Sequence, residues 1–159
     1  MPETGDAGGR ADTRSGGGPD DGPGGQSPSE QIAATIPYAG VLGITMEEAT
    51  PEVVSGSLAW SPERCTSSGV MHGGVIMSLA DTVGAVCAWL NLPPGANTAT
   101  VESATNFFRG VRAGTLHATA RPLHVGRSFI AVRTELTDDE GRLVGQTTQT
   151  QAVITPRPG

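Results

Sequence analysis

A single long apolar segment limits the folds open to this chain more than any other feature does. Apolar residues recur at steps of three and four from Val75 to Leu90, which predicts a helix with a continuous apolar face. Further small and apolar residues widen that face, so we expect the helix to be enclosed on more than one side. Pro93 and Pro94 end the helix, because proline lacks the N–H group that the helical hydrogen-bond ladder requires.

The segments around this helix have the composition of strands. A short turn or helix near 38–42 leads into a first strand, and 52–61 is a second strand before the helix. After the helix come segments rich in Val, Thr and Phe, at 97–111, 114–126, 127–137 and 142–155, with a hairpin turn at 138–141. Two strands, one helix and three or four antiparallel strands make an α+β layout. An antiparallel sheet wrapped around one long central helix is the economical packing.

The first thirty residues differ from the rest, because they contain nine Gly and four Pro but no Val, Ile, Leu, Phe, Trp or Tyr. We therefore predict a disordered acidic tail at 1–30 and a single domain at 31–159. The tail has neither the apolar stretch of a secretory signal nor the basic character of a transit peptide. Cys65 and Cys87 are too few for a disulfide framework, so we expect a cytoplasmic protein.

Charge and residue content exclude several classes of function. The net charge of −6 argues against nucleic-acid binding. The chain has no lysine, which excludes P-loop ATPases and Schiff-base or pyridoxal enzymes. The three histidines, His72, His117 and His124, lack ligand-like partners, so we expect no metal and no redox cofactor. No window approaches about 18 uninterrupted apolar residues, so we expect no membrane partner.

Gly73 and Gly74 stand where the helix begins. Backbone N–H groups in the first turn of a helix have no intrahelical acceptor and lie at the positive end of the helix dipole. Because glycine lacks a Cβ, a carbonyl oxygen can approach those N–H groups closely, as in an oxyanion hole. The alternative is that the glycine pair only permits close packing where the chain enters the helix.

Asp81 lies in the middle of the apolar helix, where a carboxylate has poor helix propensity and a high desolvation cost if it is buried. A carboxylate kept at such a place indicates a paired structural group or a catalytic base or nucleophile. The alternative is a solvated carboxylate at the edge of the helix, or one that bonds a neighbouring hydroxyl such as that of Ser78.

The spacing of these two features predicts an oligomer. Gly73 and Asp81 are eight residues apart, about 12 Å along one helix at roughly 1.5 Å per residue. A reacting carbonyl must lie about 3 Å from both its oxyanion donor and the attacking group, which a single helix does not easily provide. Two antiparallel helices related by a two-fold axis would bring Gly73 of one chain to Asp81 of the partner subunit. We therefore predict a homodimer with two composite sites.

The segments VMHGGVIMSLADTVG (70–84) and TATVESATNFFRGVRAG (98–114) resemble the hotdog-fold acyl-CoA thioesterases. Within them, the phenylacetate-pathway and Arthrobacter-type 4-hydroxybenzoyl-CoA branch is the most similar. The resemblance covers roughly residues 36–155 and implies a sheet wrapped around a central helix. It also implies active sites at the interface of a homodimer, which often pairs further into a homotetramer.

By position, the resemblance implies roles for five residues. The Gly73 N–H would polarise a thioester carbonyl, and Asp81 would act as nucleophile through an anhydride or as general base on water. His72 matches a positioning histidine, with a hydrogen-bonded histidine at the helix start as the alternative. Thr66 stands where the family often has Asn or Gln beside the oxyanion. Thr100 matches a hydroxyl that orients the hydrolytic water, with an ordinary strand threonine as the alternative.

The resemblance also implies substrate contacts at six positions: Gly74, Gly84, Arg109, Arg112, Arg127 and Ser128. The arginines at 109 and 112 would meet the phosphates of coenzyme A through planar guanidinium groups, and 126–128 would be a surface turn that contacts coenzyme A. Each arginine is alternatively a solvated surface residue. The glycine at 84 would leave room beside the carboxylate for an acyl or aromatic group along the helix.

We therefore expect a homodimeric or homotetrameric enzyme that hydrolyses an aromatic or medium-chain acyl-CoA thioester to the free acid and coenzyme A. Hydratases of the same fold pair a catalytic histidine with an acid in a different motif, which the sequence lacks. The alternative that stays open is an acyl-CoA-binding hotdog protein without catalytic activity.

Overall fold

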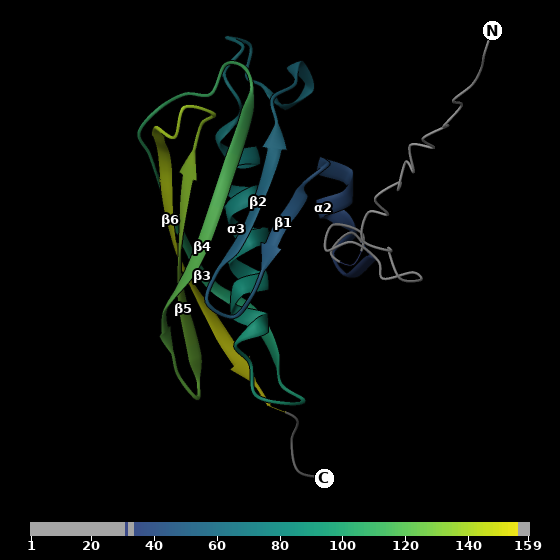
Figure 1. Cartoon of the computed structure of the whole chain (residues 1–159), viewed down its shortest axis with the longest axis vertical. Helices are drawn as coiled ribbons and strands as arrows, with labels where there is room; N and C mark the ends of the chain where they lie inside the picture. Colours follow the sequence, from purple (N-terminus) through teal and green to yellow (C-terminus); the bar gives the residue numbers. More distant parts are fainter. Residues whose placement is uncertain (1–30, 32–33, 156–159) are drawn as a thin grey trace, which may run out of the picture.

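The computed structural model describes residue 31 and residues 34–155 (Figure 1). The predicted tail at 1–30 lies outside the described residues. The elements follow in the order α2 (Pro37–Leu42), β1 (Thr45–Ala49), β2 (Val54–Ala59), a 3₁₀ helix η1 (Pro62–Arg64), α3 (Gly73–Leu90), β3 (Asn97–Phe107), β4 (Thr115–Val125), β5 (Phe129–Thr137) and β6 (Leu143–Ile154). The predicted α+β layout is confirmed, and the short 3₁₀ helix was not predicted.

The strands form one antiparallel six-stranded sheet in the order β1-β2-β4-β5-β6-β3. The long helix α3 lies along one face of this sheet and contacts all six strands (Figure 1). The predicted wrapping of a sheet around a central helix, the hotdog arrangement, is therefore what the structure shows.

The core lies between α3 and the inner face of the sheet. Strands β4 and β5 alternate between buried and less buried residues over most of their length, and their inward residues are almost fully buried: Leu116, Ala118, Ala120, Ile130, Val132 and Leu136. Side chains of α3 meet them, with Leu79, Val83 and Cys87 fully buried. Cys87 is thus a core residue, whereas the Cys65 thiol is only partly buried and donates to the carbonyl of Ser61.

The two edges of the sheet differ in a way that affects assembly. β1 is five residues long, carries Glu47 and Glu48, and has an irregular register between Met46 and Glu48. Short, charged and irregular edges resist pairing with another chain. β3 is eleven residues long and, among the described residues, pairs only with β6, so its other edge is open there. An open edge of that length is a template for adding a strand.

The helix α3 also has an exposed apolar side next to this open edge. Met77 is 39% exposed and Trp89 is 56% exposed, and Val101 on β3 is 68% exposed. Among the described residues α3 is the one helix long and apolar enough to cross a membrane, with a mean hydropathy of 1.5 over 18 residues. Half of that stretch is buried, and a core helix meets the same criteria, so packing inside the sheet accounts for its composition.

Strand β3 ends earlier than expected. The sequence predicted a strand over 97–111, but pairing with β6 stops at Phe107 opposite Gly145. The N–H groups of Phe108 and Arg109 then both donate to the carbonyl of Val144, and the chain turns away from the sheet. Consequently Arg109, which the predicted strand included, belongs together with Arg112 to a loop, the 108–114 connection.

Candidate active site

The start of α3 is built as the sequence indicated, with two glycines in its first turn. His72 caps the helix, and its Nδ1 accepts the Gly74 N–H at 2.9 Å. The capping bond uses the Gly74 donor, whereas the Gly73 N–H has no acceptor among the described residues. One donor at the positive end of the helix dipole is therefore left for an outside acceptor.

The space in front of Gly73 is shaped by an aromatic ring. A Cβ on Gly73 would stand 3.3 Å from Cζ of Phe107, so the ring packs directly over the glycine. Gly73 also lines a pocket of about 360 Å³ together with Phe107, Phe108 and Arg109. A flat apolar wall, one unpaired N–H and a nearby guanidinium thus meet at this end of the helix.

Asp81 lies two turns further along α3 and is half-buried. Its Oδ1 accepts a short hydrogen bond from Nε2 of Gln149 on β6 and a long one, 3.5 Å, from the hydroxyl of Thr100 on β3. Ser78, considered above as a partner, instead donates to the carbonyl of Gly74. Oδ2 of Asp81 has no hydrogen-bond partner among the described residues, so one carboxylate oxygen is held and the other is free.

Burial raises the pKa of Asp81 above its ordinary value of 3.8, and the hydrogen bond from Thr100 opposes part of that rise. In its ionised form, a carboxylate with a raised pKa is a stronger base than an exposed one. Among the described residues no cation forms an ion pair with Asp81. The carboxylate therefore owes its raised basicity to its position between the helix and the sheet.

Sequence analysis missed Gln149, which is fully buried. The inner face of β6 carries Thr147, Gln149 and Gln151 at alternate positions, and all three are buried. A strand that is covered by a helix normally presents apolar residues to it. The segment QTTQTQ is polar at every position, and that run inside a core strand was the available signal of a polar site.

Gly84 faces this buried amide. A Cβ at position 84 would stand 2.1 Å from Oε1 of Gln149 and 3.3 Å from Oγ1 of Thr134. Glycine in a helix interior costs about 1 kcal/mol relative to alanine, so its presence needs a reason. The sequence analysis expected the glycine to leave room beside Asp81 for an acyl group. It does leave room, and the side chain of Gln149 occupies that room.

The buried amide is only partly satisfied. Among the described residues, Oε1 of Gln149 and Oγ1 of Thr134 are buried without a hydrogen-bond partner. Each such atom costs roughly 1–3 kcal/mol relative to a satisfied one. The hydroxyl of Thr100 is better connected, because it accepts from Nε2 of Gln151 at 2.8 Å and from Nε2 of Gln149 at 3.4 Å. The fold thus tolerates a destabilising polar cluster beside Asp81.

A surface groove runs along α3 past the carboxylate; we call it the Asp81 groove. It has a volume of about 480 Å³ and is lined mainly by the helix, from Gly74 through Asp81 to Ala85, with Tyr38 and Ser103 at its sides. A second groove of about 300 Å³ shares Ala85 and continues towards Trp89. The lining is largely apolar apart from the carboxylate and the hydroxyl groups.

The predicted roles of Thr66 and Thr100 differ in their structural setting. The hydroxyl of Thr66 is 2.9 Å from that of Ser68 and 3.3 Å from the carbonyl of Val70, within its own turn. An oxyanion role for Thr66 would need that hydroxyl to turn its proton away from the carbonyl of Val70. Thr100, in contrast, was expected to orient the hydrolytic water, and its hydroxyl lies 3.5 Å from Oδ1 of Asp81.

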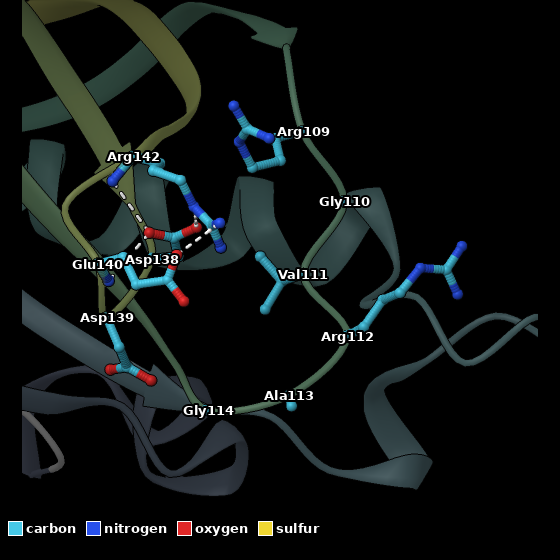
Figure 2. A pocket seen from close by; sticks show the side chains of 10 residues that line it. All are labelled: Arg109, Gly110, Val111, Arg112, Ala113, Gly114, Asp138, Asp139, Glu140 and Arg142. Carbon is cyan, nitrogen blue, oxygen red and sulfur yellow. Dashed lines mark hydrogen bonds and ion pairs between the residues drawn. The ribbon is translucent and has the colours of Figure 1, made fainter.

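The predicted phosphate contacts divide between two ends of the molecule. Arg109 and Arg112 line a pocket of about 430 Å³ between the 108–114 connection and the β5–β6 turn (Figure 2). In that pocket Arg142 is paired with Asp138 at 2.7 Å and with Glu140. Arg109 and Arg112 form no ion pair among the described residues, and Arg112 extends away from the acidic turn towards the carbonyl of Ser68 (Figure 2).

Arg127 and Ser128 lie in the β4–β5 turn, far from the pocket with Arg109. β3 ends opposite Gly145 and β5 begins opposite Ala152, seven positions (145 to 152) along β6. That separation is about 23 Å at roughly 3.3 Å per residue. One protomer therefore does not bring the two arginine groups to the same phosphate. No group of three or more potential metal-ligating side chains occurs among the described residues.

Comparison with known proteins identifies the group to which this chain belongs. The family model of the thioesterase superfamily matches residues 68–145, which include the helix start, Asp81 and the 108–114 connection. The Mycobacterium tuberculosis protein Rv1847 is 31% identical over 118 residues, covering 72% of this chain and 84% of that protein. Its solved structure superposes with a TM-score of 0.72 at 30% identity, over 77% of this chain and 100% of that one. The chain belongs to the thioesterase superfamily.

Two further members of the superfamily bear on the chemistry. A mutant of the thioesterase PA1618 from Pseudomonas aeruginosa superposes with a TM-score of 0.75 at 28% identity, over 81% of this chain and 96% of that one. The 1,4-dihydroxy-2-naphthoyl-CoA hydrolase of Escherichia coli is 25% identical over 115 residues, covering 72% of this chain and 85% of that enzyme. The present thioesterase-family chain thus shares its hotdog fold with hydrolases of thioesters. The similarity does not single out the 4-hydroxybenzoyl-CoA or phenylacetate branch.

Proposed function

We propose that this thioesterase-family protein hydrolyses acyl-CoA thioesters in a site shared by two protomers. The observation that carries the proposal is the state of Asp81, a half-buried carboxylate with a raised pKa and one free oxygen at a groove along α3. Gly73 would polarise the thioester carbonyl through its unpaired N–H group. His72 is a positioning residue in this scheme, because its capping bond fixes the first turn of the helix.

Two routes lead from this arrangement to products. As general base, Asp81 takes a proton from water, the oxygen of that water attacks the carbonyl carbon, and the C–S bond breaks to release the thiol. As nucleophile, a carboxylate oxygen attacks the same carbon and the C–S bond breaks to expel the thiolate. Water then hydrolyses the anhydride to the free acid and the Asp81 carboxylate, and the proton released is taken up by the thiolate. Thr100 would orient water in the first route, and the contact of its hydroxyl with Oδ1 of Asp81 supports this role.

The open edge of β3 supports the shared site. Gly73 and Asp81 lie on one straight helix, so one chain separates them by about 12 Å. A partner that packs on the exposed side of α3 and on β3 would cover Met77 and Val101 and reach the Asp81 groove. Burial of such side chains is worth about 25 cal/mol per Å² of apolar surface. A homodimer, itself able to pair into a tetramer, would complete the sites.

The pocket and groove suggest where the parts of the substrate lie. Arg109 borders both the pocket at Gly73 and the pocket of Figure 2, so a phosphate bound by Arg109 and Arg112 would lie on the Gly73 side of the carbonyl. The acyl group, aromatic or of medium length, would follow the apolar groove beside Asp81. Arg127 and Ser128 would contact coenzyme A only from the partner subunit. We place the reaction in the cytoplasm.

A panel of acyl-CoA thioesters, followed by release of the free thiol, tests the proposal. We expect turnover of at least one aromatic or medium-chain member by the wild-type protein. The alternative function, binding of acyl-CoA without catalysis, predicts tight binding in calorimetry and no thiol release from any member of the panel. Free thiol in stoichiometric excess over protein would reject that alternative.

The rate is expected to depend on pH through Asp81. Both routes require the ionised carboxylate, so kcat/KM should fall as the pH drops through the pKa of Asp81. Because burial raises that pKa, the fall should begin at a higher pH than for an exposed aspartate. A pH–rate profile with the best substrate measures it. An acid limb at the ordinary aspartate pKa of 3.8 would contradict the assignment.

A further inference from the structure

We propose that Gln149 is the positioning residue of the catalytic carboxylate, holding Oδ1 of Asp81 through its amide N–H so that Oδ2 faces the reacting atoms. This inference rests on the proposed function, because it assumes that Asp81 carries the chemistry. Gln149 itself does not reach the groove, since its side chain is fully buried beneath α3. It acts on the substrate only through Asp81.

The contact is specific in its geometry. Gln149 approaches Asp81 from the sheet side of the helix, and its Nε2 bonds one of the two carboxylate oxygens. The other oxygen has no partner among the described residues, and Asp81 lines the groove on the outer side. A carboxylate that is held at one oxygen cannot rotate freely about its χ angles. The free oxygen is therefore presented in one direction.

Neighbouring residues fix the position of the Gln149 amide. Gly84 leaves the space in which Oε1 lies, since a Cβ there would be 2.1 Å from that atom. The same Nε2 is 3.4 Å from the hydroxyl of Thr100, and Gln151 holds that hydroxyl at 2.8 Å. Thr98 in turn donates to Oε1 of Gln151 at 3.2 Å. A chain of hydrogen bonds across β3 and β6 thus fixes both groups that contact the carboxylate.

Folding alone does not account for this amide. Oε1 of Gln149 is buried without a partner among the described residues, and an apolar side chain of the same length would remove that unsatisfied acceptor. Natural proteins retain destabilising groups of this kind mainly where function needs them. The amide of Gln149 donates a hydrogen bond to Asp81. This contact indicates that the function in question is the positioning of the Asp81 carboxylate.

The variant Gln149→Met tests the inference, because methionine has nearly the same length and no hydrogen-bonding amide. We expect kcat to fall about 10- to 100-fold with KM nearly unchanged, since the carboxylate is misplaced while the binding groove stays intact. Loss of an N–H donor to the carboxylate should also raise the pKa of Asp81, so the acid limb of the pH–rate profile should move to higher pH. The midpoint of thermal unfolding should not decrease.

Gln146→Met is the matched control. Gln146 lies on the same strand as Gln149 but on the other face of the sheet, and it pairs with Glu135 of β5. We expect wild-type kcat and pH profile for it. A second variant, Gln149→Glu, places two carboxyl groups in contact, so they should share one proton and move the acid limb further up. This variant keeps the length and polarity of the side chain, and it serves where Gln149→Met does not fold.

A direct measurement separates this inference from the proposed function. Carbon-13 NMR of the Asp81 carboxyl gives its pKa in the wild-type protein and in Gln149→Met without substrate. An unchanged pKa and an unchanged kcat in a folded Gln149→Met protein would overturn the positioning role. If Asp81→Asn itself retained full activity, the proposed function would fail, whatever the NMR titration gave.

Discussion

Replacing Asp81 with asparagine is expected to lower kcat for thioester hydrolysis by about 10²- to 10⁴-fold. Asparagine keeps the size of the side chain, and its carbonyl oxygen still accepts the hydrogen bond from Gln149. What it lacks is the ability to take a proton from water or to attack a carbonyl carbon at neutral pH. Steady-state assays of thiol release, with protein of equal purity and concentration, give the ratio.

Stability provides the control for this loss. The pKa of Asp81 is raised in the folded protein, so the folded state binds this proton more tightly than the unfolded state does. The contribution of Asp81 to the free energy of unfolding is therefore largest at low pH, and it decreases as the pH rises through the raised pKa. Asp81→Asn should therefore unfold at an equal or higher temperature than wild type at neutral pH. Glu52→Gln, an exposed loop substitution, should leave both activity and stability unchanged.

Mixing two inactive variants is expected to restore activity, which is the second large effect. Asp81→Asn removes the acid, and Gly73→Val fills the carbonyl pocket, because even a Cβ at position 73 would stand 3.3 Å from the ring of Phe107. Each variant alone should be inactive as a homodimer. In a mixed dimer, one of the two sites would combine an intact Gly73 with Asp81 of the partner subunit.

The recovered rate has a definite size. Random exchange makes half of the dimers mixed, and half of their sites are intact, so the mixture should regain about a quarter of the wild-type rate. Unfolding and refolding the two variants together, followed by thiol-release assays, measures it, with each variant refolded alone as the control. A site contained within one chain would give no recovery at any ratio, and a monomer in sedimentation experiments would reject the shared site outright.

The fold was predictable because its signals are local. The periodicity from Val75 to Leu90 needs only one face of a helix to be buried, and the alternation of Leu116, Ala118 and Ala120 needs only one face of a strand. Strand order was not predictable in this way, since β6 is inserted between β5 and β3 by long-range pairing. The end of β3 at Phe107 depended on its partner strand as well.

From spacing alone the site was predictable only along the helix, because Thr100 on β3 was indicated by the family resemblance. Gly73, His72 and Asp81 share one continuous segment, so their spacing could be converted into distances. Gln149 comes from the last strand, and only the register of β6 against β3 and α3 brings it to the carboxylate. Arg127 shows the converse, because its residue type suited a phosphate while the fold places it at the far end of β6 from Arg109.

The close fit between Gly84 and Gln149 constrains how this protein can change over evolutionary time. A mutation that adds a methyl group at 84 forces the amide of Gln149 to shift, and shortening the amide first removes the group that holds Asp81. Neither single step is neutral, so the two positions should be inherited together in descendants that keep the same carboxylate. A descendant that loses both Gly84 and Gln149 would need a hydrogen-bond donor from another strand to hold its catalytic carboxylate.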